Sequence, residues 1–299
     1  GEWEDVVDAW QLQTWEDYRD VKRLGRKTRL SEQQRLALWE VFEIVKRRLG
    51  EQGLLTRAQM FSQLAAKLQS RRNPPFDCAV IDEAQDIGVA QLRFLAALGC
   101  GRPNALFFAG DLGQRIFQTP FSWKSLSVDV RGRSQTLRIN YRTSHQIRIQ
   151  ADRLLGPQVS DVDGNVEDRR GTVSVFNGPP PDIRVFDGGE QEIAAVGAWI
   201  SERIAEGVVP HEIGIFVRSS EQIDRATEAA QALGSPFKVL DEHMETSTGV
   251  LSVSTMHLAK GLEFRAVIVM ACDDEVIPLQ ERIESVADDA DLQEVYDTE

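Results

Sequence analysis

Two adjacent carboxylates, those of Asp82 and Glu83, follow a short apolar run in FDCAVIDEAQD, residues 76–86. The run is typical of a buried strand, and the ligands of open parallel sheets collect at the carboxyl ends of the strands. A magnesium ion on nucleotide phosphates needs only one or two protein carboxylates, and an adjacent acid can orient the attacking water. The pair therefore predicts phosphate chemistry. The alternative is that both acids only cap the following helix, where the helix dipole favours negative charge.

The next apolar run repeats this arrangement. In ALFFAGDLGQRIF, residues 105–117, Asp111 follows the run and Gln114 comes three residues later. Parallel strands bring their carboxyl ends to one edge of a sheet, so we expect Asp82, Glu83 and Asp111 to share that edge. The amide of Gln114 can contact a phosphate. Helix capping explains one strand that ends in carboxylates more easily than two neighbouring ones.

The N-terminal part of the chain has the pattern of helices. Ser31 with Gln34, and Thr56 with Gln59, match the spacing of a capping box, in which side chain and backbone satisfy each other at a helix start. Gly50 is expected to end the first of these helices, because glycine adopts the left-handed conformation of a C-terminal cap. We therefore expect a helical subdomain ahead of the two acids.

After residue 73, short apolar runs alternate with helical patterns, which predicts an α/β architecture with parallel strands buried on both faces. The expected strands are residues 78–81, 105–109, 173–176, 183–186, 213–218, 250–254 and 266–270. The expected helices are residues 89–98, 190–205 and 220–233. A chain of 299 residues is long enough for two domains.

The composition argues against several classes of protein. No apolar run approaches the ~20 residues that span a bilayer, so we expect no membrane partner. The three cysteines form no C-x-x-C pair, which gives no support to a zinc site or a disulfide framework and favours a cytoplasmic location. The net charge of −13 disfavours broad nonspecific nucleic-acid binding, but residues 131–153 hold six arginines against one acid. A local basic surface is expected despite the acidic total.

Four segments resemble, in the same order, the motifs of the UvrD/Rep/PcrA helicases of superfamily 1A. VIDEAQD (80–86) resembles motif II, the Walker B element, and GDLGQRIF (110–117) resembles motif III. LRINYRTSHQI (137–147) resembles motif IV, and VSTMHLAKGLEFRAVIV (253–269) resembles motif V. The resemblance implies RecA-like domains of the P-loop NTPase type, with ATP and Mg²⁺ bound between two of them.

The resemblance also implies which residues act on ATP. Asp82 and Glu83 would bind magnesium, and Glu83 would also polarise the hydrolytic water. Gln114 would contact the γ-phosphate. Tyr141 would stack on adenine, and Arg142 would neutralise charge on the transferring phosphoryl group. The alternatives are that Tyr141 fills the core and that Arg142 is a surface ion-pair partner.

In the motif V segment, the resemblance implies that Glu263 binds the ribose and that Thr255 and His257 approach the DNA backbone. The alternative for His257 is a structural role. After motif III, family members stack aromatic side chains on single-stranded DNA, because every base has a π face.

The candidates for this contact are Phe117 and the pair Trp123 and Lys124. The letters QTPFS separate Phe117 from that pair, where family members have one residue. Phe121 therefore competes for the stacking role, and a core or loop-anchor position is the alternative.

The resemblance divides the chain into a 1B-like helical subdomain (1–72), the later part of the first RecA-like domain (73–132) and the second RecA-like domain (133–299). About 107 residues separate Tyr141 from Thr248, so we expect the 2B insertion of the family to be absent or vestigial. The chain has no G-x-x-x-x-G-K-[ST] phosphate loop and no motif VI arginine. We expect a longer polypeptide, of which this part alone does not hydrolyse ATP appreciably.

The sequence thus predicts part of an ATP-dependent helicase or translocase that moves 3′ to 5′ on single-stranded or partial-duplex DNA, in repair or replication, with repair or nuclease proteins as partners. One alternative is a noncatalytic helicase-like module that binds DNA or a protein, which the missing phosphate loop favours. Another is a metal-dependent nuclease that uses Asp82, Glu83 and Asp111.

Overall fold

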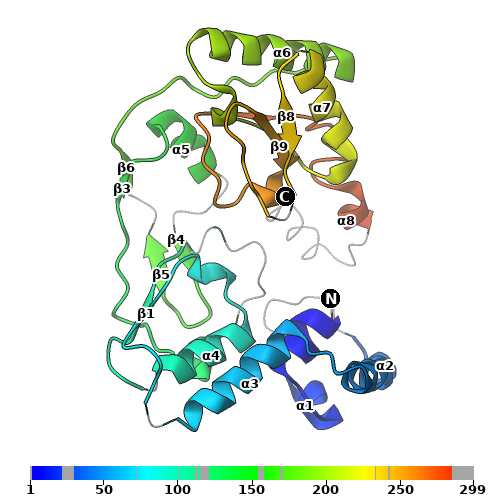
Figure 1. Cartoon of the computed structure of the whole chain (residues 1–299), viewed down its shortest axis with the longest axis vertical. Helices are drawn as coiled ribbons and strands as arrows, with labels where there is room; N and C mark the ends of the chain where they lie inside the picture. Colours follow the sequence, from blue (N-terminus) through cyan, green and yellow to red (C-terminus); the bar gives the residue numbers. More distant parts are fainter. Residues whose placement is uncertain are drawn as a thin grey trace. The chain divides into compact units, whose positions relative to one another are not determined.

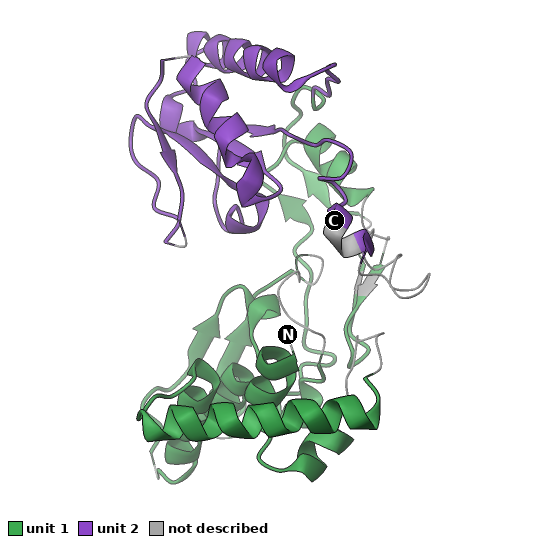
Figure 2. Ribbon diagram, turned by 90° about the vertical axis from the view of Figure 1, so that its right-hand side faces the viewer, with its two compact units in different colours: residues 1–181 green, residues 182–299 purple. Residues whose placement is uncertain are grey.

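The chain forms two compact units in a computed structural model, residues 1–181 and residues 182–299 (Figure 2). The structure describes residues 2–21, 30–71, 73–99, 101–111, 114, 121–153, 158–168, 171–232, 234–241 and 243–284. Both units are mixed α/β, with small sheets that are mostly parallel. The domain boundary expected between residues 132 and 133 lies inside the first unit and stays a prediction.

The first unit begins with helices, as the sequence predicts. They are η1 (Trp3–Asp8), α1 (Trp15–Asp20), α2 (Glu32–Glu51) and α3 (Arg57–Gln69). Capping boxes open α2 at Ser31 and α3 at Thr56, which confirms both predicted starts. Gly50 was expected to end α2, but it lies inside that helix, and the left-handed residue that follows is Gly53, with φ of 65°. Tyr18 is fully buried and stacks on Trp39 at 5.4 Å between ring centroids.

A two-stranded parallel sheet follows, formed by β1 (Ala79–Ile81) and β2 (Leu106–Phe108). Between the strands lie η2 (Ala84–Asp86) and α4 (Val89–Gly99), and α4 packs beside α3 (Figure 1). Ala65 and Leu68 of α3 meet Ala97 and Leu98 of α4 in a buried cluster that also contacts Ala79. The sheet is therefore covered by helices on the face that Ala79 shares.

The rest of the first unit consists of short elements. They are η4 (Lys124–Leu126), β3 (Ile139–Asn140), α5 (His145–Asp152), β4 (Gln158–Ser160), β5 (Val166–Asp168) and β6 (Val173–Ser174). Strands β3 and β6 pair in parallel, and β4 and β5 form an antiparallel hairpin. Of these elements, only β6 overlaps an expected strand.

The second unit holds a four-stranded parallel sheet in the order β10-β7-β9-β8. Its elements are α6 (Gly189–Ala205), η5 (Pro210–Glu212), β7 (Ile213–Val217), η6 (Ser220–Gln222), α7 (Ile223–Ala232), β8 (Phe237–Val239), β9 (Leu251–Thr255), η7 (Met256–Leu258), β10 (Ala266–Val269) and α8 (Gln280–Glu284). Side chains of α6 and α7, including Ile200 and Ala229, form the main core with β7 and β9. Helices α6 and α7 lie beside the sheet in Figure 1.

Residues 183–186 were expected to form a strand, and this prediction is wrong. Ile183 and Val185 are 84% and 94% exposed, so the apolar run has neither a pairing strand nor a core to enter. Strand β8 is the converse case: its sequence has no strong strand pattern, but it pairs with β9 in the sheet. Within the described residues, no helix combines the length and the apolarity that crossing a membrane requires.

Candidate functional site

The parallel register of β1 and β2 brings the predicted acids to one edge of the sheet. Ile81 is opposite Phe108, so Asp82 and Glu83 leave the end of β1 where Asp111 follows the end of β2. The backbone pairing continues past the strands, because the Ala84 N–H donates to the Ala109 carbonyl at 2.8 Å. Asp82 and Glu83 are exposed, and Asp111 is half-buried.

Glu83 has a left-handed backbone, with φ of 50° and ψ of 43°. Residues other than glycine rarely adopt this region, and such strain is concentrated at functional sites. The Glu83 N–H donates to Asp82 Oδ1 at 2.8 Å, which joins the two acids. Glu83 occupies the N-cap position of η2 but makes no side-chain capping bond. The helix-capping alternative therefore lacks its defining contact at Glu83.

Gln85 links the two strand ends, a role that the sequence did not reveal. Its buried side chain donates from Nε2 to Glu83 Oε2 at 2.5 Å and accepts the Asp111 N–H on Oε1 at 3.0 Å. Gly110 makes this approach possible, since a Cβ there would lie 2.4 Å from Gln85 Oε1. One amide thus fixes the side chain of one acid and the backbone of another. The only sequence signal was a glutamine two residues after Glu83.

Gln114 lies beside Asp111, as the three-residue spacing suggested. Its Nε2 donates to Asp111 Oδ2 at 2.8 Å, and its backbone N–H donates to the Asp111 carbonyl at 3.0 Å. Gln114 is exposed. The amide therefore stands at the sheet edge next to a carboxylate, where it is accessible to a ligand.

Tyr141 and Arg142 follow β3 on a turn that Asn140 organises. Asn140 Oδ1 accepts the Arg142 N–H at 2.8 Å and the Thr143 N–H at 3.0 Å, and Asn140 Nδ2 donates to Thr143 Oγ1 at 2.7 Å. Asparagine commonly forms such a turn by accepting the backbone N–H two residues on. Tyr141 is 73% exposed, which excludes the alternative that it fills the core.

A cavity of about 380 Å³ brings these two segments together within the first unit. Asp111, Tyr141 and Arg142 all line it, with residues from β3 and α5. At its wall, Arg148 and Asp152 form an ion pair at 2.5 Å, with 14% and 29% of their side chains exposed. The cavity thus combines an acid from a strand end, an aromatic face and a guanidinium. Asp82, Glu83 and Gln114 do not line it.

The structure describes three of the four residues considered for the DNA contact after motif III, and they differ in exposure. Phe117 lies outside the described residues. Trp123 is half-buried, and its ring packs edge-on against Phe108 of β2 at 4.9 Å between centroids. Phe121 joins the same hydrophobic cluster. Lys124 is exposed at the start of η4. Trp123 therefore anchors this segment, and Lys124 is its accessible cation.

The motif V residues belong to the second unit. Thr255 is buried at the carboxyl end of β9, and its Oγ1 lies 3.5 Å from Nε2 of the exposed His257 on η7. Glu263 is exposed in the connection that returns to the start of β10. The structure thus places Thr255 and His257 together and Glu263 on a separate loop.

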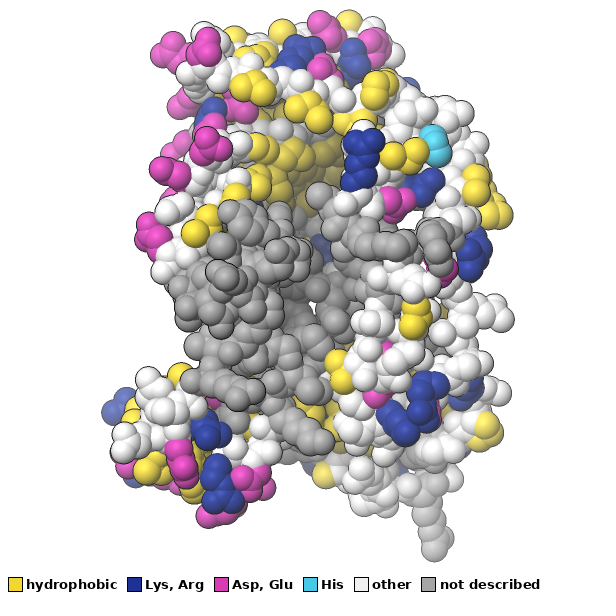
Figure 3. All heavy atoms as spheres, turned by 180° about the vertical axis from the view of Figure 1, so that it is seen from behind, with side chains coloured by type: hydrophobic (Ala, Val, Ile, Leu, Met, Phe, Trp, Pro, Cys, Tyr) yellow, Lys and Arg dark blue, Asp and Glu magenta, His cyan; other side chains and the backbone are white. Residues whose placement is uncertain are grey.

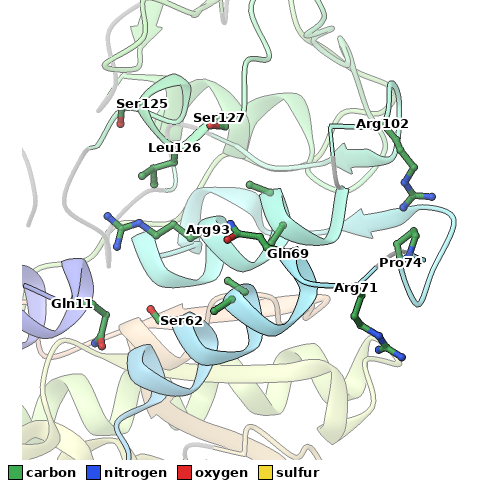
Figure 4. Close-up of a pocket in the computed structure, with 14 residues that line it drawn as sticks. Gln11, Ser62, Gln69, Arg71, Pro74, Arg93, Arg102, Ser125, Leu126 and Ser127 are labelled. Atoms are coloured by element: carbon green, nitrogen blue, oxygen red, sulfur yellow. The ribbon is translucent and has the colours of Figure 1, made fainter.

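A larger cavity of about 1020 Å³ lies along α3, α4 and η4 and contains none of the predicted site residues (Figure 4). Two of its arginines already bind backbone carbonyls. Arg93 donates to the Trp10 carbonyl at 2.9 Å, and Arg102 donates to the Phe76 carbonyl at 2.8 Å. We therefore regard it as a groove between helices rather than the centre of the chemistry.

Charged side chains of both signs occur across the visible face in Figure 3. In the arginine-rich segment, Arg131 pairs with Asp129 at 2.6 Å and Arg148 pairs with Asp152. The local positive field is therefore weaker than the six arginines suggest.

The described residues contain no group of three His, Cys, Asp or Glu side chains that could hold a metal ion. Asp82, Glu83 and Asp111 thus do not form the three-carboxylate group on which the nuclease alternative depends. A magnesium ion bound mainly by nucleotide phosphates needs fewer protein ligands. The exposed carboxylate of Asp82 fits that lesser requirement, since it offers the hard oxygen donors that magnesium takes.

The fold and the site are compatible with a RecA-like nucleotide-binding fold. In sequence, the chain is 28% identical over 169 residues to proteins named ATP-dependent DNA helicase UvrD2 from Mycobacterium bovis and from two strains of Mycobacterium tuberculosis. The match covers 55% of this chain and 24% of each relative, so the aligned part spans about a quarter of their length. No protein-family model matches the chain. The likeness supports a relationship to UvrD-like helicases.

Proposed function

We propose that the chain carries part of the ATP-hydrolysing and DNA-contacting surface of a UvrD-like helicase or translocase. One observation carries the proposal: Asp111, Tyr141 and Arg142 line a single cavity, although 29 residues lie between Asp111 and Tyr141 in the sequence. The convergence of an acid, an aromatic face and a permanent cation suits an adenine nucleotide. The name of the relatives, ATP-dependent DNA helicase UvrD2, agrees with this assignment.

Within this proposal, Asp82 and Glu83 would hold the magnesium ion of a bound nucleotide, which neutralises phosphate charge. Glu83 accepts a proton from the attacking water, and Gln85 holds its carboxylate toward the sheet edge. Gln114 senses the terminal phosphate beside Asp111. Tyr141 stacks on the base, and Arg142 binds the phosphates. The resemblance assigns the ribose contact to Glu263.

The DNA partner would be single-stranded or partial-duplex DNA, with movement from 3′ to 5′. Lys124 contributes a phosphate contact after motif III, and the exposed His257, with Thr255 beside it, contributes another in the second unit. The cellular setting that we propose is the cytoplasm, in DNA repair or replication with repair or nuclease partners.

The rival proposal is a noncatalytic helicase-like module. The absence of a phosphate loop from these 299 residues favours it. The two proposals differ in a simple binding measurement on this chain. The catalytic proposal expects a fluorescent ATP analogue to bind with magnesium and to lose affinity in Tyr141→Ala, whereas the rival expects the analogue not to bind.

The hydrolytic role of Glu83 is tested in the complete gene product. Glu83→Gln keeps the shape of the side chain but removes its basicity, so DNA-stimulated ATP turnover should fall by about 100-fold or more while ATP affinity changes little. Glu40→Gln, at an exposed position on α2, is the matched control and should leave turnover unchanged. Equal turnover in Glu83→Gln and in the unmodified protein would refute the assignment.

A further inference from the structure

The β4–β5 hairpin holds the segment that follows motif III. Asp163, at the tip of the hairpin, accepts the hydroxyl of Ser122 on Oδ1 at 2.5 Å and the backbone N–H of Lys124 on Oδ2 at 3.0 Å. These partners lie 41 and 39 residues away in sequence. One carboxylate therefore uses both oxygens to fasten a distant segment.

The hairpin tip also has hydrogen bonds of its own. The Asp161 carboxylate accepts the N–H groups of Asp163 and Asn165 at 3.0 and 2.8 Å, and the side-chain amide of Asn165 at 2.6 Å. Gly164 allows the tight turn, with φ of 81°. The Asp163 carboxylate is thus presented by a closed loop, so little further conformational entropy is lost when it binds.

The segment that it holds is equally ordered. Ser122 Oγ accepts the Ser125 N–H at 3.0 Å, and the Ser122 carbonyl accepts the Ser125 hydroxyl at 2.7 Å. Between the two residues that Asp163 binds, the Trp123 ring packs on Phe108 of β2. The segment is therefore fixed on one side to the strand that leads to Asp111 and on the other side to the hairpin. Lys124 remains exposed on it.

We propose that Asp163 is a positioning residue for DNA binding: it sets the backbone of Lys124 so that the ammonium group meets a phosphate of single-stranded DNA. This inference rests on the proposed function, because it takes DNA as the ligand of Lys124. The hairpin follows α5, which begins three residues after Arg142. Asp163 therefore also links the DNA-contacting segment to the part of the chain that carries the nucleotide cavity.

Charge alone predicts the opposite effect on DNA affinity when the Asp163 carboxylate is removed. A carboxylate close to a DNA-binding lysine weakens the attraction for phosphate, so its removal should tighten binding if charge alone matters. Positioning predicts that its removal weakens binding. Asp129 gives a matched comparison, because it is an exposed acid on the same segment, outside the contact with the hairpin.

The experiment measures binding of a fluorescein-labelled oligothymidylate to the full chain by anisotropy, over a series of salt concentrations. Asp163→Asn should weaken binding about 3- to 10-fold and lower the salt slope by about 0.7, the value for one lost phosphate contact on a single strand. Lys124→Ala should do the same, and the double variant should bind no more weakly than Lys124→Ala alone. Asp129→Asn should bind equally well or more tightly.

The salt slope separates positioning from a general loss of folded protein, which would lower the active fraction but leave the slope unchanged. If Asp163→Asn fails to fold by circular dichroism, Ser122→Ala takes its place. It removes one of the two hydrogen bonds to Asp163 and should also lower the salt slope, by a smaller amount. Unchanged slopes in folded Asp163→Asn or Ser122→Ala, with the unmodified chain still binding, overturn the positioning role alone. If the unmodified chain binds no oligonucleotide, the DNA function itself fails, and this inference fails with it.

Discussion

In the second unit every residue of β7 and β9 is buried, whereas in the first unit the middle residues of β1 and β2 are exposed. Val80 and Phe107 are partners in register and are 74% and 63% exposed, so one apolar face of this sheet is uncovered. In the second unit, Ile215 and Val253 are also partners in register, and both are fully buried. Both sheets are parallel, yet only the central strands of the second sheet, β7 and β9, are covered on both faces.

Parallel pairing alone therefore does not determine how stable a sheet is. Parallel strands are normally buried on both faces, and full burial of one Val or Phe side chain contributes about 1.5–3 kcal/mol. The candidate nucleotide site therefore lies at the end of a sheet that lacks part of this stabilisation. Its geometry depends more on polar contacts such as that of Gln85.

The largest effect that tests the comparison comes from the same substitution in the two sheets. Val253→Asp places a carboxylate at a fully buried position on β9, and we expect it to cost more than about 4 kcal/mol and to abolish the cooperative unfolding of the second unit. Val80→Asp adds the same group at an exposed position on β1, where we expect a cost below about 1 kcal/mol. Urea denaturation followed by circular dichroism measures both. Equal destabilisation by the two variants would contradict the difference in coverage.

A smaller effect is expected at the contact between the two strand ends of the first unit. Gly110→Ala places a Cβ 2.4 Å from Gln85 Oε1 and 3.0 Å from the Ala84 nitrogen, so Gln85 or the backbone must shift. We expect a loss of about 1–3 kcal/mol, together with weaker binding of a fluorescent ATP analogue, because Gln85 orients Glu83.

Gly50→Ala is the control for Gly110→Ala. No atom lies within 4 Å of the added Cβ, and Gly50 is inside α2, where alanine is the better helix former by about 1 kcal/mol. The two glycine substitutions should therefore change stability in opposite directions. A Gly110→Ala variant that is as stable as the unmodified chain would show that the strand ends are not tightly packed.

The elements that the sequence predicted are those with a local cause. Ser31 and Thr56 begin helices because each side chain caps the backbone three residues away, and β7 is a continuous apolar run. Residues 183–186 (IRVF) are also mostly apolar, but no strand pairs with them, so the local pattern alone gave a wrong prediction. The turn at 161–165 carried a usable signal, since Asp, Gly and Asn are typical of tight turns.

The parts of the site that the sequence missed depend on distant contacts. Gln85 acts through Asp111, 26 residues away, and no local pattern reports that distance. Asp163 acts on Ser122 across 41 residues. The acids at the strand ends were predictable because parallel pairing alone brings them to one edge. Side-chain contacts between separate loops require the folded structure.

The smallest expected effect concerns an ion pair of the first unit. The Arg131 guanidinium donates to Asp129 at 2.6 Å, with the two side chains 46% and 47% exposed. The Arg131 side chain, followed by its backbone N–H, lowers the pKa of Asp129 far below its ordinary value of 3.8. Because the folded pKa is depressed, the stabilisation is present above pH 3.8 and is lost as the pH falls through the folded pKa.

We therefore expect Arg131→Gln to raise the titration midpoint of Asp129 toward 3.8 in a carboxyl NMR titration, with no change in the urea midpoint near neutral pH. In the second unit, Arg225 binds Glu192 at 2.6 Å, with only 21% and 13% of the side chains exposed. Arg225→Gln leaves Glu192 largely desolvated without its cation, so it should lower the urea midpoint measurably. If Asp129 titrates at its ordinary pKa with Arg131 present, the pair does not form in solution. If Arg225→Gln is as neutral as Arg131→Gln, burial does not distinguish the ion pairs of the two units.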